Sequence, residues 1–240
     1  MTRIAVIVPA YNEEQALAAV VQSIKLIALQ EKLDLEVIVV NDCSTDGTAG
    51  VMDTLPCIAI HLPVNLGIGG AMQTGFKYAL ENGFDFAVQM DGDGQHPATD
   101  LPLLIKKQKQ SGSDVVIGSR FINKQGYQSS AIRRMGINYF SRLNKILLGI
   151  ELSDCTSGFR LLNSKALVLA AESYPDEYPE PESLVYFSRN KLRITEVAVS
   201  MLERQGGVSS IGRRDSVYYM IKVSLAIFFT YIRNTPNHKS

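Results

Sequence analysis

Residues 84–97 read FDFAVQMDGDGQHP, an apolar run that changes abruptly into a short acidic segment with glycines. The run up to Met90 is typical of a buried β-strand, and two carboxylates, Asp91 and Asp93, follow it directly. Side chains two positions apart on an extended segment point to the same side, so both carboxylates and Gln95 can face one ion. Magnesium and manganese favour such oxygen ligands, and a diphosphate can supply others. The simpler interpretation is an Asp/Gly turn after a strand.

Outward from this stretch, apolar runs of strand length alternate with segments of helical spacing. Strands are predicted at residues 4–9, 37–40, 58–62, 84–90 and 114–118, and helices at 13–30, 71–80 and 97–110. This alternation predicts an α/β fold, with helices flanking a mostly parallel sheet. Ligands bind beyond the carboxyl ends of the strands in such sheets, and the polar segments 9–13, 41–46 and 91–96 fall there.

The pattern changes after Arg120. A helix is predicted at residues 131–148, a strand at 193–202, and a strongly apolar helix with one charge at 217–232, with loops at 154–160 and 203–212. Residues 178–182, YPEPE, form an acidic insert stiffened by proline, and the sequence assigns it no role.

Length and composition exclude several classes of protein. The 240 residues suffice for one large α/β domain or a domain with a small appendage. Twenty-four basic and 24 acidic residues cancel, so no nucleic-acid partner is expected. The three cysteines, Cys43, Cys57 and Cys155, are widely separated, which fits a reducing compartment and gives no zinc pattern. Residues 1–3 lead straight into a strand instead of a secretory signal, so a cytoplasmic location is expected.

Two other strand ends carry polar side chains that suit a nucleotide. In VVNDCSTDGT, residues 39–48, Asp42 could accept a hydrogen bond from a base N–H, or the residues behind it could only cap the next helix. In PAYNEE, residues 9–14, the acidic pair equally suits the start of a helix. The glycine-rich turn NLGIGGA, residues 65–71, lets the backbone approach a ligand closely.

These motifs, together with GSRF at residues 118–121, resemble in their order the inverting family-2 glycosyltransferases. Within that family the sequence is most similar to the dolichyl- or polyprenyl-phosphate sugar transferases. The resemblance implies a GT-A, Rossmann-like domain over residues 1–210. A C-terminal acceptor-side segment, an apolar helix with a polar tail, would follow at residues 211–240.

The resemblance also implies a nucleotide-sugar donor and a divalent cation, Mg²⁺ or Mn²⁺. The donor would be bound by Pro9, Tyr11, Glu13, Asp42, Gly70, Asp91 and Gly92. The metal ion and the diphosphate would lie at Asp91, Asp93 and Gln95.

Two later motifs extend the resemblance to the acceptor side. DCTSGFR, residues 154–160, resembles the family's D-x-x-S-G-F-R segment, and ERQGGVSS, residues 203–210, its mobile acceptor loop. The implied catalytic residues are Asp93, Asp154 and Arg204. The implied acceptor-phosphate residues are Arg120, Arg133, Arg134, Arg160 and Ser209. A lone arginine can equally form a surface ion pair.

The nature of the acceptor decides what chemistry the second half must supply. A hydroxyl acceptor needs a general base, for which Asp154 is the best candidate. A lipid phosphate is already ionised near pH 7, so it needs positive charge, which the arginines supply. This favours a polyprenyl phosphate over a saccharide hydroxyl of envelope polysaccharide synthesis. A nucleotidyltransferase, which would carry a basic phosphate loop near its first strand, is disfavoured by the acidic segment 9–14. A non-catalytic nucleotide-sugar-binding module is disfavoured by the intact metal motif.

A lipid acceptor also predicts where the protein works. The apolar stretch at 217–232 is 16 residues long, short of the roughly 20 that cross a bilayer as a helix. It could instead lie in the interface or pack beneath a membrane-protein partner, while the basic residues of 133–145 meet anionic headgroups. We therefore expect a peripheral protein at the inner face of the membrane. A buried core helix would explain the same apolarity.

Overall fold

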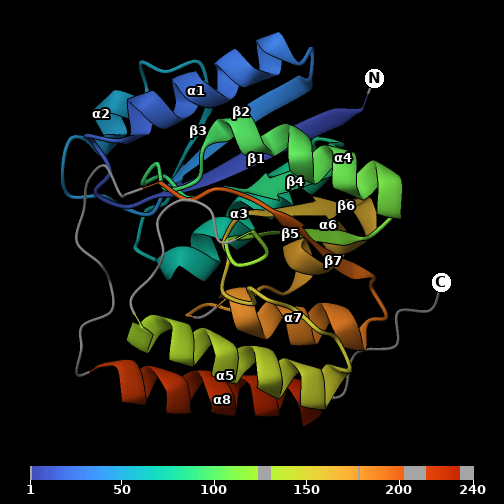
Figure 1. The fold of residues 1–240 in the computed structure, drawn as a ribbon. Coiled ribbons are helices and arrows are strands. Elements are labelled where there is room, and N and C mark those ends of the chain that lie inside the picture. The colour runs from blue at the N-terminus through green and yellow to red at the C-terminus, as the bar shows by residue number, and fades with distance from the viewer. Residues whose placement is uncertain (1, 124–130, 178, 203–214, 233–240) are drawn as a thin grey trace.

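The computed structural model describes residues 2–123, 131–177, 179–202 and 215–232 as a layered α/β fold (Figure 1). The strands are β1 (Arg3–Ala10), β2 (Asp34–Asn41), β3 (Ile58–His61), β4 (Phe86–Gln89), β5 (Val115–Ser119), β6 (Arg160–Asn163) and β7 (Ile194–Ala198). The helices are α1 (Leu17–Gln30), α2 (Thr48–Met52), α3 (Gly67–Glu81), α4 (Leu101–Ser111), α5 (Ala131–Leu148), α6 (Ser164–Glu172), α7 (Pro179–Arg189) and α8 (Asp215–Ile232). A single 3₁₀ turn, η1 (Ala98–Asp100), precedes α4.

The strands form one mixed sheet in the order β3-β2-β1-β4-β6-β5-β7. β1 pairs in parallel with β2 and β4, β2 with β3, and β5 with β7, whereas β6 is antiparallel to both its neighbours. The helices α1 and α4 pack on one face, and α3, α6 and α7 on the other (Figure 1). The predicted α/β fold with a mostly parallel sheet is therefore confirmed.

Strand β6 differs from the sequence prediction, which placed a loop up to Arg160 and no strand behind it. The run is only four residues long and begins with an arginine, so it carries no strand pattern of its own. It becomes a strand because β4 and β5 both lie beside it, with Gln89 opposite Arg160 and Val115 opposite Leu162. Tertiary pairing thus supplies the signal that the local sequence lacks.

Helix α1 begins at Leu17 instead of the predicted residue 13. The chain first turns at Asn12, whose φ is 57°, and the backbone N–H of Glu13 donates to Thr48 Oγ1 over 2.9 Å. The segment before α1 is therefore tied to the neighbouring loop, which delays the helix. Helix α3 in contrast begins early, at Gly67, because the glycine-rich turn itself forms the first helical turn.

Residues 179–182 of the acidic insert lie at the start of helix α7, and residue 178 lies outside the described residues. Pro179 suits a first helical turn because the backbone N–H that proline lacks would have no partner within the helix there. Glu180 and Glu182 suit the positive end of the helix dipole. Helix α6 was also not predicted, although Asn163 caps it by accepting a hydrogen bond from the backbone N–H of Ala166 over 3.1 Å.

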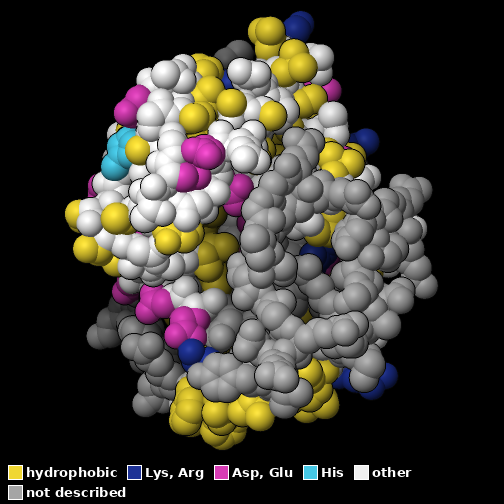
Figure 2. Space-filling model, turned by 90° about the vertical axis from the view of Figure 1, so that its left-hand side faces the viewer, with side chains coloured by type: hydrophobic (Ala, Val, Ile, Leu, Met, Phe, Trp, Pro, Cys, Tyr) yellow, Lys and Arg dark blue, Asp and Glu magenta, His cyan; other side chains and the backbone are white. Residues whose placement is uncertain are grey.

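Helices α5 and α8 form an outer layer beneath α7 (Figure 1). The predicted helix at 131–148 coincides with α5, and the apolar stretch at 217–232 lies within α8. One side of α8 is buried through Val223 and Ile227, whereas its other side exposes a hydrophobic stripe, Ile221, Leu225, Phe228, Phe229 and Ile232. Figure 2 shows hydrophobic side chains gathered along this lower edge of the molecule. None of the described helices combines the length and apolarity that a membrane crossing requires. The expected boundary at residue 210 lies outside the described residues.

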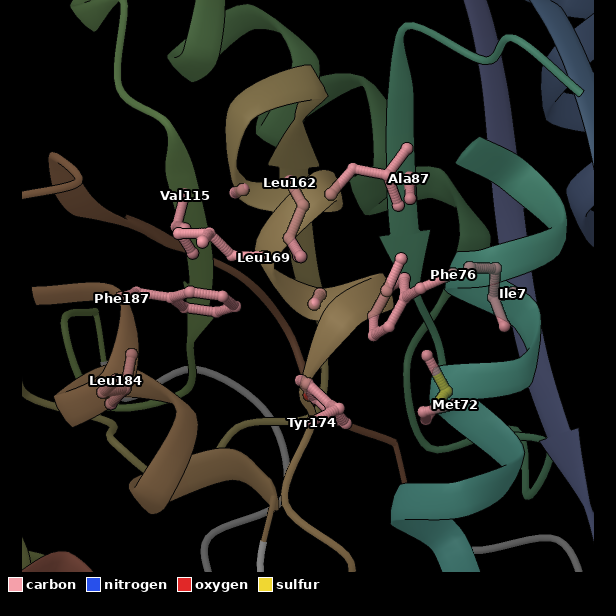
Figure 3. Close-up of a cluster of buried hydrophobic side chains, with 14 of the residues drawn as sticks. Ile7, Met72, Phe76, Ala87, Val115, Leu162, Leu169, Tyr174, Leu184 and Phe187 are labelled. Carbon is pink, nitrogen blue, oxygen red and sulfur yellow. The ribbon is translucent and has the colours of Figure 1, made fainter. Parts of the chain in front are cut away.

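The core on the α3 side of the sheet depends on one glycine. Phe76 of α3 is fully buried against a cluster that includes Ile7 of β1 and Tyr174 (Figure 3). An ideal Cβ on Gly75 would lie only 2.3 Å from Ile7 Cγ2. The missing side chain therefore lets α3 lie directly against β1.

Gly75→Ala should lower the free energy of unfolding by about 1–3 kcal/mol, since the added methyl group overpacks this contact. The matched control is Gly50→Ala in α2, where an ideal Cβ has no neighbour within 4 Å. Alanine is favoured over glycine in a helix by about 0.5–1 kcal/mol, so the control should not be destabilised. Urea denaturation of both variants measures the difference. Equal stability of the two would contradict the packing assignment.

Candidate active site

The carboxyl ends of β1, β2 and β4 lie at one edge of the sheet. Ala10 pairs with Asn41, and Ile7 with Gln89, so the three strands end close together. The polar segments 9–14, 41–48 and 91–96 all leave the sheet here, as the sequence predicts for a parallel arrangement.

Hydrogen bonds join the first two of these segments. The Asn12 side-chain oxygen accepts from the backbone N–H of Thr45 over 2.9 Å, and the backbone N–H of Asn12 donates to Ser44 Oγ over 3.0 Å. Glu13 is half-buried beside them, whereas the ring of Tyr11 is 49% exposed. The Tyr11 ring is therefore accessible to a ligand at this edge.

Asp42 is buried at the end of β2 and holds the next loop. Its Oδ1 accepts a hydrogen bond from the backbone N–H of Leu66 over 2.6 Å, and the side chain of Asn65 donates to its carbonyl oxygen over 3.1 Å. The carboxylate thus already has a structural task, which sequence reasoning missed. Base recognition by Asp42 stays a prediction.

The glycines that open α3 are required by packing. An ideal Cβ on Gly69 would lie 2.0 Å from the carbonyl oxygen of Pro175, and one on Gly70 would lie 2.5 Å from Leu66 Cβ. Packing alone therefore explains the glycine at position 70. The predicted contact between Gly70 and the nucleotide-sugar stays a prediction.

The two carboxylates of the acidic motif have different surroundings. Asp93 is only 5% exposed, and its Oδ1 accepts a hydrogen bond from the backbone N–H of Gln95 over 3.0 Å. The side chain of Asp91 is 30% exposed and lies against Gly158, where an ideal Cβ would come within 3.0 Å of Asp91 Oδ1. An ideal Cβ on Gly92 would lie 3.0 Å from the carbonyl oxygen of Pro9. The structure therefore brings the DCTSGFR segment directly against the first carboxylate.

His96 lies behind this motif as a neutral side chain. It is 3% exposed and stacks on Phe159 with ring centroids 5.1 Å apart. Burial, and after it the charge of Arg120, lower the pKa of His96 to about 4. Its Nε2 lies 3.6 Å from Asp91 Oδ2, too far for a hydrogen bond. The ring therefore packs behind the acidic turn against Phe159.

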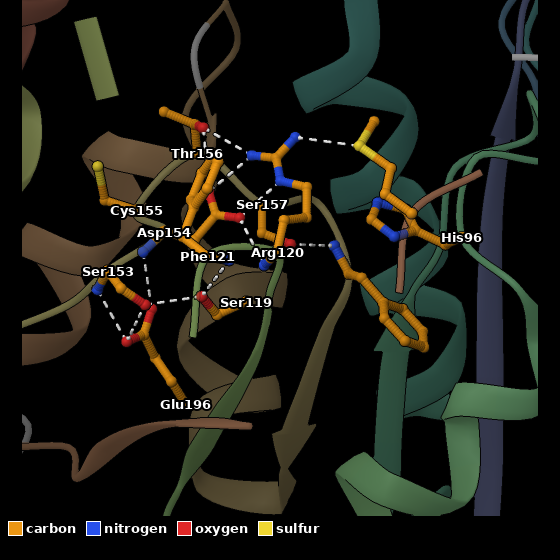
Figure 4. Close-up of polar contacts among 12 residues, drawn as sticks. His96, Ser119, Arg120, Phe121, Ser153, Asp154, Cys155, Thr156, Ser157 and Glu196 are labelled. Atoms are coloured by element: carbon orange, nitrogen blue, oxygen red, sulfur yellow. Dashed lines mark hydrogen bonds and ion pairs between the residues drawn. The ribbon is translucent and has the colours of Figure 1, made fainter. Parts of the chain in front are cut away.

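Arg120 and Asp154 form a buried, bidentate ion pair (Figure 4). Arg120 Nε and Nη2 donate to the two carboxylate oxygens, each over 2.6 Å, and Nη2 also donates to Thr156 Oγ1 over 2.9 Å. Burial acts to lower the pKa of Arg120, but the hydrogen bond and charge of Asp154 outweigh it and raise that pKa. Because Asp154 is fully buried, the structure favours a positioning role over that of a base.

Glu196 of β7 anchors the same segment, and sequence reasoning missed it. Its two carboxylate oxygens accept hydrogen bonds from the backbone N–H groups of Ser153 and Asp154, each over 2.8 Å (Figure 4). Burial raises the pKa of Glu196. The only sequence signal was a lone acidic residue within a strand, which does not identify its partner.

Arg160, which the resemblance places at the acceptor phosphate, is enclosed within the protein. Its side chain is fully buried, and its three nitrogens donate to the carbonyl oxygens of Ser157 and Cys155 and to Ser183 Oγ, over 2.7, 3.0 and 2.9 Å. A guanidinium enclosed in this way braces the 154–160 loop and offers no accessible donor to a substrate. A role of Arg160 at the acceptor phosphate stays a prediction.

The remaining acceptor-side predictions lie partly outside the described residues. Arg204 and Ser209 fall in 203–214, and Arg133 and Arg134 belong to the first turn of α5 with side chains that are not described. Their roles stay predictions.

The acidic motif fits a cation that is shared with a substrate. Among the described residues, no group of three or more His, Cys, Asp and Glu side chains is arranged to hold a metal ion. Magnesium is commonly held by one or two carboxylates together with substrate phosphates. Asp91, partly exposed at the strand end, fits such a site, with Asp93 behind it.

Comparison with known proteins relates this arrangement to one family. The model of "Glycosyl transferase family 2" matches residues 5–168. The chain is 32% identical over 218 residues to undecaprenyl-phosphate mannosyltransferase of Micrococcus luteus, covering 87% of each protein. It is also 32% identical over 216 residues to a UDP-N-acetylglucosamine–dolichyl-phosphate N-acetylglucosaminyltransferase of Methanococcus voltae, covering 82% of this chain and 84% of that protein.

A solved structure has the same fold. Glucosyl-3-phosphoglycerate synthase of Mycobacterium tuberculosis, crystallised with Mn²⁺ and UDP-glucose, superposes with a TM-score of 0.69 at 20% sequence identity. The match covers 98% of this chain and 81% of that one. At this level of identity the likeness establishes the fold, which is GT-A.

Asp154→Asn should lower the free energy of unfolding by about 3–5 kcal/mol, because it leaves the buried guanidinium of Arg120 without a compensating charge. The exposed ion pair between Lys145 and Glu151 provides a control, since Glu151→Gln should change stability by no more than about 0.5 kcal/mol. Thermal and urea denaturation measure both. An Asp154 variant as stable as the control would contradict the assigned pairing.

Proposed function

The chain belongs to glycosyl transferase family 2, and from this premise we propose that it moves a sugar from a nucleotide-sugar to a polyprenyl phosphate, inverting the anomeric carbon. The observation that carries the choice of acceptor is the enclosure of Asp154. A hydroxyl acceptor needs a base, and the best carboxylate candidate is buried and doubly bonded to Arg120. A phosphate acceptor needs no such base.

The reaction is a single displacement at the anomeric carbon. An ionised phosphate oxygen of the acceptor attacks that carbon, the bond to the diphosphate breaks, and its electron pair leaves with the nucleoside diphosphate. Tyr11 is accessible at the donor edge of the sheet, and the tied segments 9–14 and 41–48 give that edge a fixed shape. A fixed shape of the donor edge would hold the donor in position, which lowers the barrier to displacement.

A divalent cation belongs to the proposal, with Asp91 and Asp93 as the residues that would hold it. When bound, Mg²⁺ or Mn²⁺ offsets the negative charge that builds on the leaving diphosphate. Asp91 has the more accessible carboxylate, while Asp93 is held by the backbone of Gln95 and keeps the motif in shape.

The names of the relatives support the acceptor class and leave the sugar open. One relative is named for mannose and undecaprenyl phosphate, and the other for N-acetylglucosamine and dolichyl phosphate. Polyprenyl phosphate is common to the two names. The saccharide-hydroxyl alternative uses the same donor site, so an acceptor assay separates the two.

A transfer assay tests donor, metal and acceptor together. The wild type should transfer sugar from a nucleotide-sugar to polyprenyl phosphate. It should not transfer sugar to polyprenol or to oligosaccharides. Asp91→Asn should reduce transfer by at least about tenfold, as should excess chelator. Product is measured by chromatography of a radiolabelled sugar.

Asp85→Asn is the matched control, because Asp85 precedes the same strand at its opposite end and is exposed. Its activity should equal that of the wild type. Transfer to a saccharide hydroxyl but not to the lipid phosphate would refute the acceptor, and activity that survives the chelator would refute the metal.

Because a polyprenyl phosphate lies in a membrane, we also propose that the protein is peripheral at the inner face of the membrane. The exposed stripe of α8 presents Phe228 and Phe229, each at least 50% exposed, and the neighbouring α5 adds Ile146 and exposed Arg142. Tyr139 of α5 hydrogen-bonds Ser224 of α8 over 3.1 Å, so the two helices present one surface. Apolar side chains flanked by basic ones suit an anionic lipid surface.

Phe228→Ser combined with Phe229→Ser should reduce flotation with anionic liposomes severalfold, since both rings lose their apolar contact with lipid. Leu29→Ser is the control, because Leu29 is 78% exposed on α1, on the other side of the sheet (Figure 1). Flotation at low and high salt separates the apolar contribution from the charged one. A wild type that stays in the soluble fraction at low salt would refute the membrane surface.

A further inference from the structure

The acidic insert at the start of α7 has no part in the proposed chemistry, yet it reaches the strand that carries Asp91. Glu180 and Glu182 lie in the first turn of α7 and point to different partners. Gln89, the last residue of β4, donates from its Nε2 to Glu180 Oε1 over 3.2 Å. Glu182 Oε1 instead accepts from Thr230 Oγ1 of α8 over 2.7 Å. The two carboxylates therefore fasten α7 to opposite sides, one inward and one outward.

The amide of Gln89 is held from both sides. While its nitrogen donates to Glu180, its oxygen accepts from the hydroxyl of Tyr174 over 2.8 Å. Gln89 is fully buried and Tyr174 is 5% exposed, so water does not offer an easy substitute for either bond. A buried amide with both ends bonded can occupy only one orientation.

Arg160 completes this buried layer. It stands opposite Gln89 in the antiparallel ladder and donates to Ser183 Oγ, while Ser183 Oγ donates to the carbonyl oxygen of Glu180. Burial raises the pKa of Glu180, the nearby charge of Arg160 opposes that rise, and the charge of Asp91 adds to it.

We propose that Glu180 is a positioning residue for the donor site, which fixes the Gln89 side chain and thereby the strand end that carries Asp91. Gln89 and Asp91 are two positions apart, so on an extended segment their side chains project to the same side. Asp91 lies against Gly158, two residues before Arg160. The buried layer of Gln89, Arg160 and Glu180 thus supports both the carboxylate and the segment packed against it. This inference rests on the proposed function for what Asp91 binds, and on the contacts alone for how Asp91 is held.

Three variants separate positioning from simple stabilisation. Glu180→Leu replaces the carboxylate with an apolar side chain of similar size and so removes the hydrogen-bond acceptor. Glu180→Gln keeps an acceptor oxygen for Gln89. Glu182→Leu is the matched control, because it removes a carboxylate two residues further along α7 that bonds α8 instead.

The first measurement uses ligand-free protein. Hydrogen–deuterium exchange should be about tenfold faster in Glu180→Leu for the amides of residues 89–91, where the N–H of Met90 donates to the carbonyl oxygen of Ile7 over 3.0 Å. Glu180→Gln and Glu182→Leu should keep the wild-type rate there. Unchanged exchange in Glu180→Leu would overturn the proposal.

The second measurement is calorimetric titration of Mn²⁺ in the presence of a nucleoside diphosphate. Glu180→Leu should weaken binding about tenfold, the usual scale for a residue that orients a metal ligand. Glu180→Gln should bind within about twofold of the wild type, and Glu182→Leu should match it even if it unfolds at a lower temperature.

Two titration outcomes would overturn the proposal. If Glu180→Gln binds as weakly as Glu180→Leu, the charge is required and the hydrogen bond is not the cause. If Glu180→Leu binds as the wild type does, the link to Asp91 is absent. A wild type that binds no Mn²⁺ with the nucleotide would instead refute the proposed function, and the exchange rates would still decide whether Glu180 holds the strand end.

Discussion

The parallel pairing of β1 with β2 on one side and β4 on the other is the constraint on which the site depends. Parallel neighbouring strands end at the same edge of the sheet. The polar residues that follow each strand therefore come together although they are far apart in the sequence. Asn12 then bonds Thr45, and Asp42 bonds Leu66, which converts three separate loops into one surface. Buried valines and isoleucines keep the register, because a slip of one residue would turn apolar side chains to the wrong face.

The second constraint is the antiparallel strand β6 between β4 and β5. It returns the chain to the sheet so that DCTSGFR runs past the acidic motif, and Gly158 leaves room for the Asp91 carboxylate. Two buried arginines stabilise this segment in different ways. Arg120 pairs with Asp154, whereas Arg160 donates to carbonyl and hydroxyl oxygens. A buried charge needs hydrogen-bond or ion-pair partners within the protein. Both arginines therefore stabilise the shape of the site.

The helices beneath the sheet connect this site to the outside of the molecule. Helix α7 bonds β4 through Glu180 and α8 through Glu182, and α8 turns a hydrophobic stripe outward. The surface proposed to meet lipid and the strand that carries the acidic motif are therefore separated by a single helix. An enzyme that joins a water-soluble donor to a lipid acceptor needs its donor site close to its lipid-facing surface.

The sequence by itself determined the α/β class, the parallel strands of the first half, the helix at 131–148 and the strand-end motifs. Each of these leaves a local pattern, because the residues that pack against the sheet recur with the period of a strand or a helix. The sequence also identified the family, since five short motifs in one order are specific together. Only the tertiary structure decided that residues 160–163 form a strand, that residues 179–182 begin a helix, and that the Arg160 side chain is enclosed. It also decided that Asp154 is paired with Arg120 and held by Glu196. Several of the deciding partners are distant along the chain: Arg160 bonds Ser183, 23 residues away, and Asp154 bonds Arg120, 34 residues away. Neither propensity nor spacing can report a partner at that distance, because long-range contacts are chosen by the packing of the whole sheet.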